Sequence, residues 1–338
     1  MSHSLRIKNA VKAPLHFLAD QLGPHRYSTR KNQLWVLMYH RILPVHDPRY
    51  RTEEPGMIVT PESFRQQLRI IKQLFAVMPL SEWTQRRASN QPLPARACAI
   101  TFDDGWRDNF EFALPALQAE QLPATVFAVS DMIGTKQQFW PNRLSRLLAL
   151  ADIDRQALRS FDWLQAFTTY QTSGVHSREA IAALINECKR LSDPQLRTNL
   201  DAMEADTGLA SLPEPSLMNW SEVRQMQATG LVEIGSHTCH HTRLVKGLPE
   251  KTLHAEIVDS RSKLEAQLEK PVTLFCYPNG DFSAAAAKLV SENYAAAVTT
   301  QSGINALPAS THQLHRIGIH EDVSNTPTRF RARLSGWI

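Results

Sequence analysis

The stretch Ala97-Cys98-Ala99-Ile100-Thr101-Phe102-Asp103-Asp104-Gly105 decides the class of fold. Its first six residues form a short apolar run, which predicts a buried strand. Asp and Gly favour turns, so Asp103-Asp104-Gly105 predicts the end of that strand. The stretch therefore places two carboxylates directly after a buried strand.

Strands and helices alternate on both sides of this stretch. We expect helices at 60–75, 109–121, 250–268 and 283–293, and strands at 34–39, 76–80, 97–102, 124–129, 232–235, 272–277, 295–299 and 314–319. Strands that alternate with helices imply a mainly parallel sheet covered by helices. The sequence therefore predicts an α/β fold.

Two segments depart from this alternation. Residues 135–215 contain helical patches but no good strand, so we expect a helical insertion there. In residues 1–33, apolar side chains recur at helical spacing, namely Leu5, Val11, Leu15, Leu18 and Leu22. This amphipathic segment either packs on the domain or rests on a membrane surface. Residues 34–338 then form the main domain.

Composition narrows the function further. The 338 residues are 43% hydrophobic and 21% charged, with a net charge of +4, which is typical of an ordinary globular protein. Basic residues form no concentrated stripe, so no nucleic-acid partner is expected. The N-terminus lacks the apolar run of a signal peptide, and no stretch reaches the roughly 18 apolar residues of a spanning helix. We therefore expect a cytoplasmic protein, or a peripheral one at the inner face of the membrane.

Polar side chains follow several of the expected strands. They are His40, Asp103, Asp104, His237 with His241, and the turn 278–280. In parallel barrels and sheets the carboxyl ends of the strands meet on one face, so these groups are expected to lie together.

The histidines indicate a metal site. His237 and His241 are four residues apart and can reach one ion, and a carboxylate completes a set with open positions for water and substrate. Such a set suits Zn²⁺, with Co²⁺ or Ni²⁺ as alternatives. Successive side chains at a strand end diverge, so one aspartate can face the metal and its neighbour the attacking water. The alternatives are that the histidines only cap or solvate the loop and that Asp-Asp-Gly is only a turn.

Two segments resemble the first two motifs of the polysaccharide deacetylase family, the NodB-homology carbohydrate esterases. They are Thr101-Phe102-Asp103-Asp104-Gly105 and Ser236-His237-Thr238-Cys239-His240-His241, and the likeness runs from about Trp35 to about His320. The resemblance implies a distorted (β/α) barrel with fewer than eight regular strands. It also implies that Asp103 is the general base and that Asp104, His237 and His241 are the metal ligands.

The third family motif, Arg-x-Pro-aromatic-Gly, is altered here to Cys276-Tyr277-Pro278-Asn279-Gly280. Cys276 replaces the arginine that usually accompanies the base. The backbone N–H of Asn279 is still able to stabilise an oxyanion, because that role needs no particular side chain. The fourth motif, with its Asp and Trp, is not found after Tyr294.

The general acid has several candidates. The segment 37–41, Leu-Met-Tyr-His-Arg, resembles the circularly permuted branch of the family that acts on exopolysaccharides, which implies that His40 is the acid. His315 and His320, near a remnant of the usual C-terminal Leu-x-His, are the alternatives.

Aromatic residues near the motifs complete the expected site. Trp106, Tyr277 and Pro278 are expected to contact the sugar, while Trp140 and Asn142 either line a sugar subsite or belong to the core of the insertion. The resemblance implies hydrolysis of N-acetyl groups on amino sugars of a surface polysaccharide or its lipid-linked precursor. The alternatives are an inactive carbohydrate-binding or scaffold protein on the same barrel, and a deformylase of a lipid-linked amino sugar.

Overall fold

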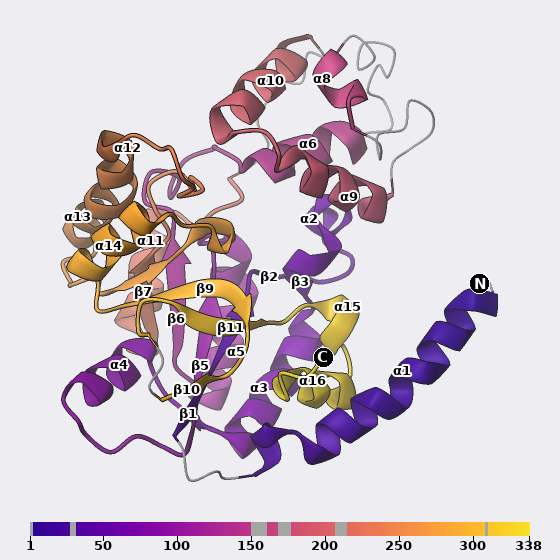
Figure 1. Cartoon of the computed structure of the whole chain (residues 1–338), viewed down its shortest axis with the longest axis vertical. Helices are drawn as coiled ribbons and strands as arrows, with labels where there is room; N and C mark the ends of the chain where they lie inside the picture. The colour runs from indigo at the N-terminus through magenta and orange to yellow at the C-terminus, as the bar shows by residue number, and fades with distance from the viewer. Residues whose placement is uncertain (1–2, 28–31, 150–160, 168–176, 207–214, 308–309) are drawn as a thin grey trace.

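The computed structural model describes residues 3–27, 32–149, 161–167, 177–206, 215–307 and 310–338. These residues form a closed barrel of parallel strands wrapped by helices (Figure 1). The ring runs through β1 (Gln33–Tyr39), β11 (Leu314–Gly318), β9 (Ala296–Ser302), β8 (Leu274–Cys276), β7 (Val232–Ser236), β6 (Ala124–Ala128) and β5 (Arg96–Phe102). Because β1 pairs in parallel with both β11 and β5, the sheet closes on itself. The expectation of a (β/α) barrel with fewer than eight regular strands is confirmed.

Short strands extend or flank the ring. β4 (Ala76–Val77) pairs in parallel with β5, and β10 (Asn305–Ala306) pairs antiparallel with β1. β2 (Arg41–Ile42) and β3 (Ile58–Val59) form a separate parallel pair above the end of β1.

Helices cover the outside of the barrel. They are α2 (Pro48–Thr52), α3 (Pro61–Leu74), α4 (Leu80–Ala88), α5 (Leu114–Glu120), α11 (Trp220–Ala228), α12 (Glu250–His254), α13 (Ser260–Leu268), α14 (Ala284–Asn293), α15 (Glu321–Ser324) and α16 (Pro327–Leu334). Single turns of other helical types are η1 (Pro24–Arg26), η2 (Pro55–Met57), η3 (Asn109–Ala113), η4 (Ala255–Asp259) and η5 (Pro278–Gly280).

Side-chain alternation along the strands divides the core in two. Leu34 and Val36 of β1 belong to a buried cluster with Phe127, made largely of side chains from the barrel strands. Trp35 and Leu37 belong to the cluster shared with the surrounding helices. Successive residues of a strand point to opposite faces, so a continuous apolar run fills both the barrel and its outer layer.

The segment expected to be an insertion is helical where it is described. It contains α6 (Trp140–Ala149), α8 (Asp162–Gln165), α9 (Arg178–Cys188) and α10 (Asp193–Asp206), and the described residues between 135 and 206 include no strand. These helices share an apolar cluster of their own. Figure 1 shows them as a separate layer above the barrel.

The N-terminal helix α1 (His3–Leu22) packs on α16. Asp20 of α1 is 1% exposed and accepts hydrogen bonds from Arg26 of η1 and Arg331 of α16. It therefore joins α1 to α16. Among the described residues, no helix combines the length and apolar content that crossing a bilayer requires.

Some local expectations differ from the structure. The strand expected at 76–80 covers only Ala76–Val77, because Pro79 precedes α4, which begins at Leu80. Residues 44–60, for which no helix or strand was expected, contain α2, η2 and β3. The helix expected at 250–268 is interrupted by the π-helical turn η4, which lies between α12 and α13.

Candidate active site

The carboxyl ends of the barrel strands bring the expected polar groups to one rim. His40 follows β1, Asp103 and Asp104 follow β5, and His237 follows β7. Parallel register accounts for the first contact: Tyr39 pairs with Phe102, so the next residues, His40 and Asp103, lie side by side. The Nε2 atom of His40 is 3.7 Å from Oδ2 of Asp103.

Asp104, His237 and His241 form a set of three metal-ligand donors. Oδ1 of Asp104 lies 3.4 Å from Nε2 of His237 and 3.5 Å from Nε2 of His241. Donors placed about 2.1 Å from a tetrahedral Zn²⁺ are about 3.4 Å apart, so these spacings fit one ion. Burial lowers the pKa of His241 to about 4, which keeps this imidazole in the neutral form that binds metal.

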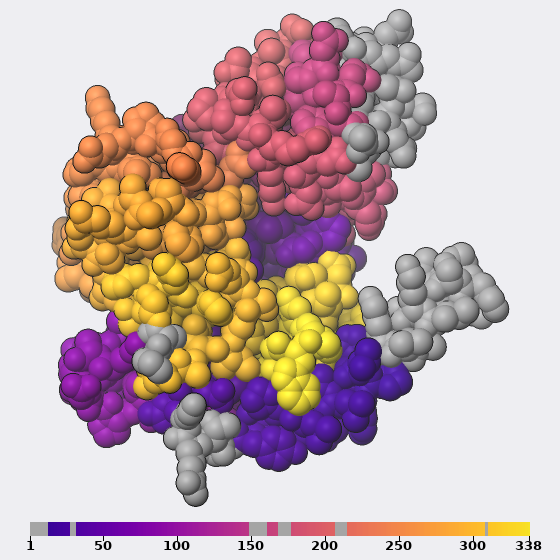
Figure 2. Space-filling model, in the orientation of Figure 1, coloured from indigo at the N-terminus to yellow at the C-terminus, as the bar shows by residue number. Residues whose placement is uncertain are grey.

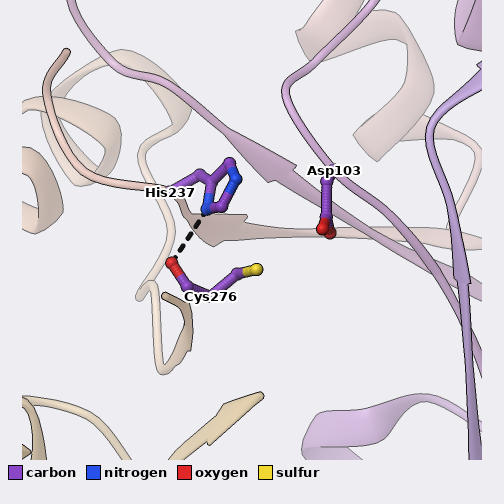
Figure 3. Close-up of side chains that lie close together, drawn as sticks. All are labelled: Asp103, His237 and Cys276. Atoms are coloured by element: carbon purple, nitrogen blue, oxygen red, sulfur yellow. Dashed lines mark hydrogen bonds between the residues drawn. The ribbon is translucent and has the colours of Figure 1, made fainter. Parts of the chain in front are cut away.

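Hydrogen bonds orient two of the donors. Nδ1 of His237 lies 2.8 Å from the carbonyl oxygen of Cys276 (Figure 3), so Nδ1–H donates there and the Nε2 lone pair faces Asp104. The indole N–H of Trp106 donates to Oδ2 of Asp104 at 2.8 Å and leaves Oδ1 for the ion. His237 and Asp104 therefore each have a fixed partner for the atom that does not bind metal.

The backbone around the ligands is left-handed at several positions. Asp104 has φ 75° and Gly105 has φ 80°, whereas Thr238 has φ 67° and His241 has φ 58°. Non-glycine residues adopt this region at a cost, and such strain concentrates at functional sites. The ligand loops are therefore held in place by their surroundings.

Glu256 holds the histidine loop. Its carboxylate accepts hydrogen bonds from the backbone N–H groups of Cys239 and His240 at 3.0 Å each, and from the Thr242 hydroxyl at 3.0 Å. It also contacts Nδ1 of His240 at 2.8 Å, which turns that ring away from the metal set. Glu256 lies in the π-helical turn η4, a type of irregularity that often marks functional sites.

Arg316 supplies the cation that the third motif lacks. Its two terminal nitrogens donate to the two oxygens of Asp103 at 2.7 Å each, and the guanidinium is fully buried. Burial acts to raise the pKa of Asp103, but the charge and hydrogen bonds of Arg316 outweigh it and lower the pKa below its usual range. Sequence analysis missed this residue. The sequence does contain a signal for it, because Arg316 is a charged side chain within the apolar run 314–319. A charged side chain in a buried strand needs a partner of opposite charge.

A second group of donors, Asp103, His237 and Cys276, also converges at the rim (Figure 3). Arg316 already occupies it, because one nitrogen lies 3.2 Å from Sγ of Cys276 while both reach Asp103. Burial raises the pKa of the Cys276 thiol, so it stays protonated. This group is consequently a cation-binding position filled by the protein itself.

The three histidines considered for the general acid lie in different environments. His40 is 19% exposed and faces Asp103. His315 alternates with Arg316 along β11, and its ring lies against Gly303 on the other face of the strand. His320 is partly buried near Asp322, and burial lowers its pKa. The geometry favours His40 over the other two.

The residues expected to contact sugar are mostly buried. Trp106 is 1% exposed beneath Asp104, and Tyr277 is fully buried. Pro278 is buried as well, whereas Asn279 is exposed at φ 58°. Burial removes Trp106 and Tyr277 from direct reach of a ligand, so we assign Trp106 to positioning of Asp104. Asn142 donates to the Glu53 carboxylate at 2.9 Å.

Residues 90–298, more than half of the chain, match the family described as polysaccharide deacetylase. YxkH of Bacillus subtilis (strain 168), whose name places it among these deacetylases, is 20% identical over 235 residues. The match covers 69% of this chain and 55% of that relative, so the chain spans just over half of its length.

Two solved structures share the fold. The deacetylase PplD of Streptococcus pyogenes, in complex with acetate, has a TM-score of 0.58 at 18% identity, covering 87% of this chain and 95% of that one. IcaB of Ammonifex degensii has a TM-score of 0.58 at 17% identity, covering 89% and 97%. At such identities the likeness establishes the barrel and nothing finer.

The hydrogen bond from Trp106 to Asp104 predicts an effect on metal affinity. Trp106→Phe is expected to weaken Zn²⁺ binding about 10- to 100-fold, because Asp104 loses the partner that orients it. Competition with a chromogenic chelator measures the affinity.

Trp83→Phe is the matched control. Trp83 is 2% exposed, and its indole nitrogen has no hydrogen-bond partner in the described residues. Equal affinities for wild type and W106F, or an equal loss in W83F, would show that Trp106 does not position the ligand.

Proposed function

Because the chain belongs to the polysaccharide deacetylase family, we propose that it removes N-acetyl groups from amino sugars of a surface polysaccharide or of its lipid-linked precursor. One observation carries this proposal: a buried carboxylate, Asp103, adjoins three converging metal-ligand donors at the barrel rim. A base beside a metal site is what hydrolysis of an amide requires.

The donor set fits a divalent metal, and we propose Zn²⁺, with Co²⁺ or Ni²⁺ as alternatives. Two imidazoles and one carboxylate with separations of 3.4 and 3.5 Å suit a tetrahedral ion that keeps an open position. Held by Asp104, His237 and His241, such an ion would supply Lewis-acid polarisation of a carbonyl and a lowered pKa of water.

The remaining roles belong to side chains and backbone of the rim. Asp103 accepts the proton of the attacking water, and Arg316 keeps that carboxylate ionised beforehand. His40 donates a proton to the leaving nitrogen from the same side of the rim as Asp103. The Asn279 N–H, which donates no hydrogen bond within the described part of the chain, stabilises the oxyanion. Acetate and the free amine are the products.

Arg316 also bears on the alternative of an inactive binding or scaffold protein. Loss of the motif arginine, replaced by Cys276, is what makes that alternative conceivable. Since a guanidinium from β11 contacts both oxygens of Asp103, the expected partner of the base is present from another strand. A deformylase would use the same groups on a smaller acyl chain, so the product must be identified directly.

Replacement of Asp103 tests the proposed chemistry. Asp103→Asn is expected to lower acetate release from N-acetylated glycans about 10²- to 10⁴-fold, because an amide cannot accept the proton. Zn²⁺ binding and glycan binding should persist, since the three ligands are intact.

Asp259→Asn, at a half-exposed carboxylate that ends η4 just before α13, is the control and should retain full turnover. Undiminished acetate release by D103N would rule out Asp103 as the base. Binding of glycans by wild type without any turnover would favour the scaffold protein, and formate release in place of acetate would favour the deformylase.

The Arg316 contact predicts a change in pH dependence. Deprotonated Asp103 is the active form, and Arg316 lowers its pKa, so the activity extends to lower pH than an unpaired carboxylate would allow. Arg316→Met should move the acid limb of the kcat/KM profile upward by about 1–3 pH units, and Arg316→Lys by less.

Three further variants, R329K, R316A and R316A/C276R, keep this test interpretable. Arg329→Lys, on the outer surface of α16, should leave the profile unchanged. R316A/C276R returns the guanidinium to the position of the family motif and should restore the acid limb relative to R316A. An unshifted limb in R316M, measured on protein with native circular dichroism, would contradict the role of Arg316.

We further propose that α1 contacts an anionic membrane surface. Of the large apolar side chains that are exposed in the described residues, five lie between 15 and 27: Leu15, Phe17, Leu18, Leu22 and Tyr27, at 50–59% exposure. Buried Asp20 anchors the helix to α16 through Arg331. Residues 1–19 carry Arg6, Lys8 and Lys12 and no acidic side chain, which complements negative lipid headgroups.

Leu18→Glu is expected to weaken partitioning of the full chain into phosphatidylglycerol-containing vesicles by about tenfold or more, because burying one leucine contributes about 1.5–3 kcal/mol. Vesicle co-sedimentation measures it. Val45→Glu, at an exposed valine elsewhere, is the control and should partition like wild type. Equal vesicle binding by L18E and wild type, or no vesicle binding by wild type, would show that α1 does not contact the membrane.

A further inference from the structure

The strand pairing that brings His40 to the rim ends at the residue before it. Tyr39 pairs with Phe102, and the Asp103 N–H donates to the Tyr39 carbonyl at 3.0 Å. Within the described residues the His40 ring makes no hydrogen bond, and its Nε2 atom lies 3.7 Å from Oδ2 of Asp103. Register therefore places His40 beside Asp103, but it does not by itself fix where the ring points.

Asn109, at the start of η3, holds the backbone of His40. Its side-chain amide N–H donates to the His40 carbonyl oxygen at 2.8 Å. A carbonyl oxygen can only accept, so the NH₂ end of the amide must face His40. Asn109 is fully buried, and its side-chain oxygen has no hydrogen-bond partner in the described part of the chain. The contact with His40 is therefore the interaction that orients this amide.

Asp108 holds the two residues that follow His40. Its Oδ1 accepts from the Ile42 N–H at 2.7 Å, and its Oδ2 accepts from two guanidinium nitrogens of Arg41 at 2.9 and 3.0 Å. Asp108 is fully buried and Arg41 is 3% exposed, so salt screens this ion pair little. The three consecutive residues from His40 to Ile42 are thus tied to Asp108 and Asn109.

A second carboxylate holds the same guanidinium. The remaining nitrogen of Arg41 donates to Glu53 at 2.6 Å, and Glu53 also accepts from Asn142 of the helical insertion at 2.9 Å. Glu53 directly follows α2, and Figure 2 shows the chain around α2 recessed between the insertion and the C-terminal segment. Arg41 is therefore held between two buried carboxylates, which fixes the chain next to His40.

The segment 103–109 sets the positions of both the proposed base and the proposed acid. Asp103 begins it and Asn109 ends it, and the Asn109 N–H donates to the Trp106 carbonyl at 3.0 Å in the turn between them. The hydrogen bonds from this segment reach the backbone of His40 and its neighbours, and they leave both ring nitrogens available. A group that donates a proton and then regains it needs such available nitrogens.

We propose that Asn109 and Asp108 are positioning residues, which place the His40 ring for proton donation to the leaving nitrogen. The inference rests on the proposed function, in which His40 is the general acid, and adds to it the groups that fix the place of that acid. Misplacement of a reacting group by about 1 Å can cost about 10²-fold in rate. Loss of either anchor should therefore lower turnover, and the loss should depend on His40.

A double-mutant cycle tests this dependence. The measured rate is kcat/KM for release of radiolabelled acetate by the Zn²⁺-loaded full chain from β-1,4- and β-1,6-linked oligomers of N-acetylglucosamine. Asn109→Ala is expected to lower it about 10- to 100-fold, and His40→Gln about 10²- to 10⁴-fold. In the H40Q background, N109A should change the rate by less than about twofold, because a residue that acts through His40 has nothing left to position.

A second variant and a matched control accompany the cycle. Asp108→Asn should likewise lose its effect in the H40Q background. Asn305→Ala is the control, because Asn305 is 5% exposed and its amide donates to the His315 carbonyl at 2.9 Å near the opposite end of β1. Any loss in N305A should be the same with and without His40. Chelator competition should give N109A the Zn²⁺ affinity of wild type.

Three results would overturn the positioning role while the proposed function stands. They are undiminished turnover in both N109A and D108N, losses that are as large in the H40Q background as in wild type, and a loss of Zn²⁺ affinity that matches the loss of rate. Undiminished turnover by H40Q would instead overturn the assignment of the acid, and this inference with it. Absence of acetate from every oligomer with wild type would overturn the proposed function itself.

Discussion

The pairing of β1 with two strands at once is the constraint on which the rest of the structure depends. β1 is matched residue for residue with β5 from Gln33↔Arg96 to Tyr39↔Phe102, and it also pairs with β11. The ladder continues past the strand end, where the Asp103 N–H donates to the Tyr39 carbonyl at 3.0 Å. Parallel register then fixes which loop residues meet, because the residues that follow two paired positions leave the barrel together.

Closure of the barrel also creates the environment in which the polar groups act. The interior is filled by apolar side chains, so a charge near it must be paired or it costs several kcal/mol. Asp103 and Arg316 satisfy this requirement for each other. The pair therefore has two functions: it makes burial of the base tolerable, and it holds the carboxylate in its ionised form.

A second chain of contacts links the insertion to the metal ligands. Asn142 of α6 donates to Glu53, and Glu53 pairs with Arg41. The Arg41 guanidinium lies 4.1 Å from the centre of the Trp106 ring, and Trp106 bonds to Asp104. The helical insertion thus supports the geometry of Asp104 from one side.

The sequence by itself determined the alternation of strands and helices, the parallel sheet, and the candidate ligands His237 and His241, whereas the choice of Asp104 over Asp103 rested on the family resemblance. These features are encoded locally, in apolar runs and in the spacing of donors along one segment. Only the tertiary structure decided that Arg316 replaces the motif arginine, and that Trp106 lies beneath Asp104. The Arg316 contact joins strands far apart in the chain, and pairing between side chains 213 positions apart has no local signature. Trp106 is only two positions from Asp104, but its burial depends on packing against Arg41 and Phe139 from distant segments.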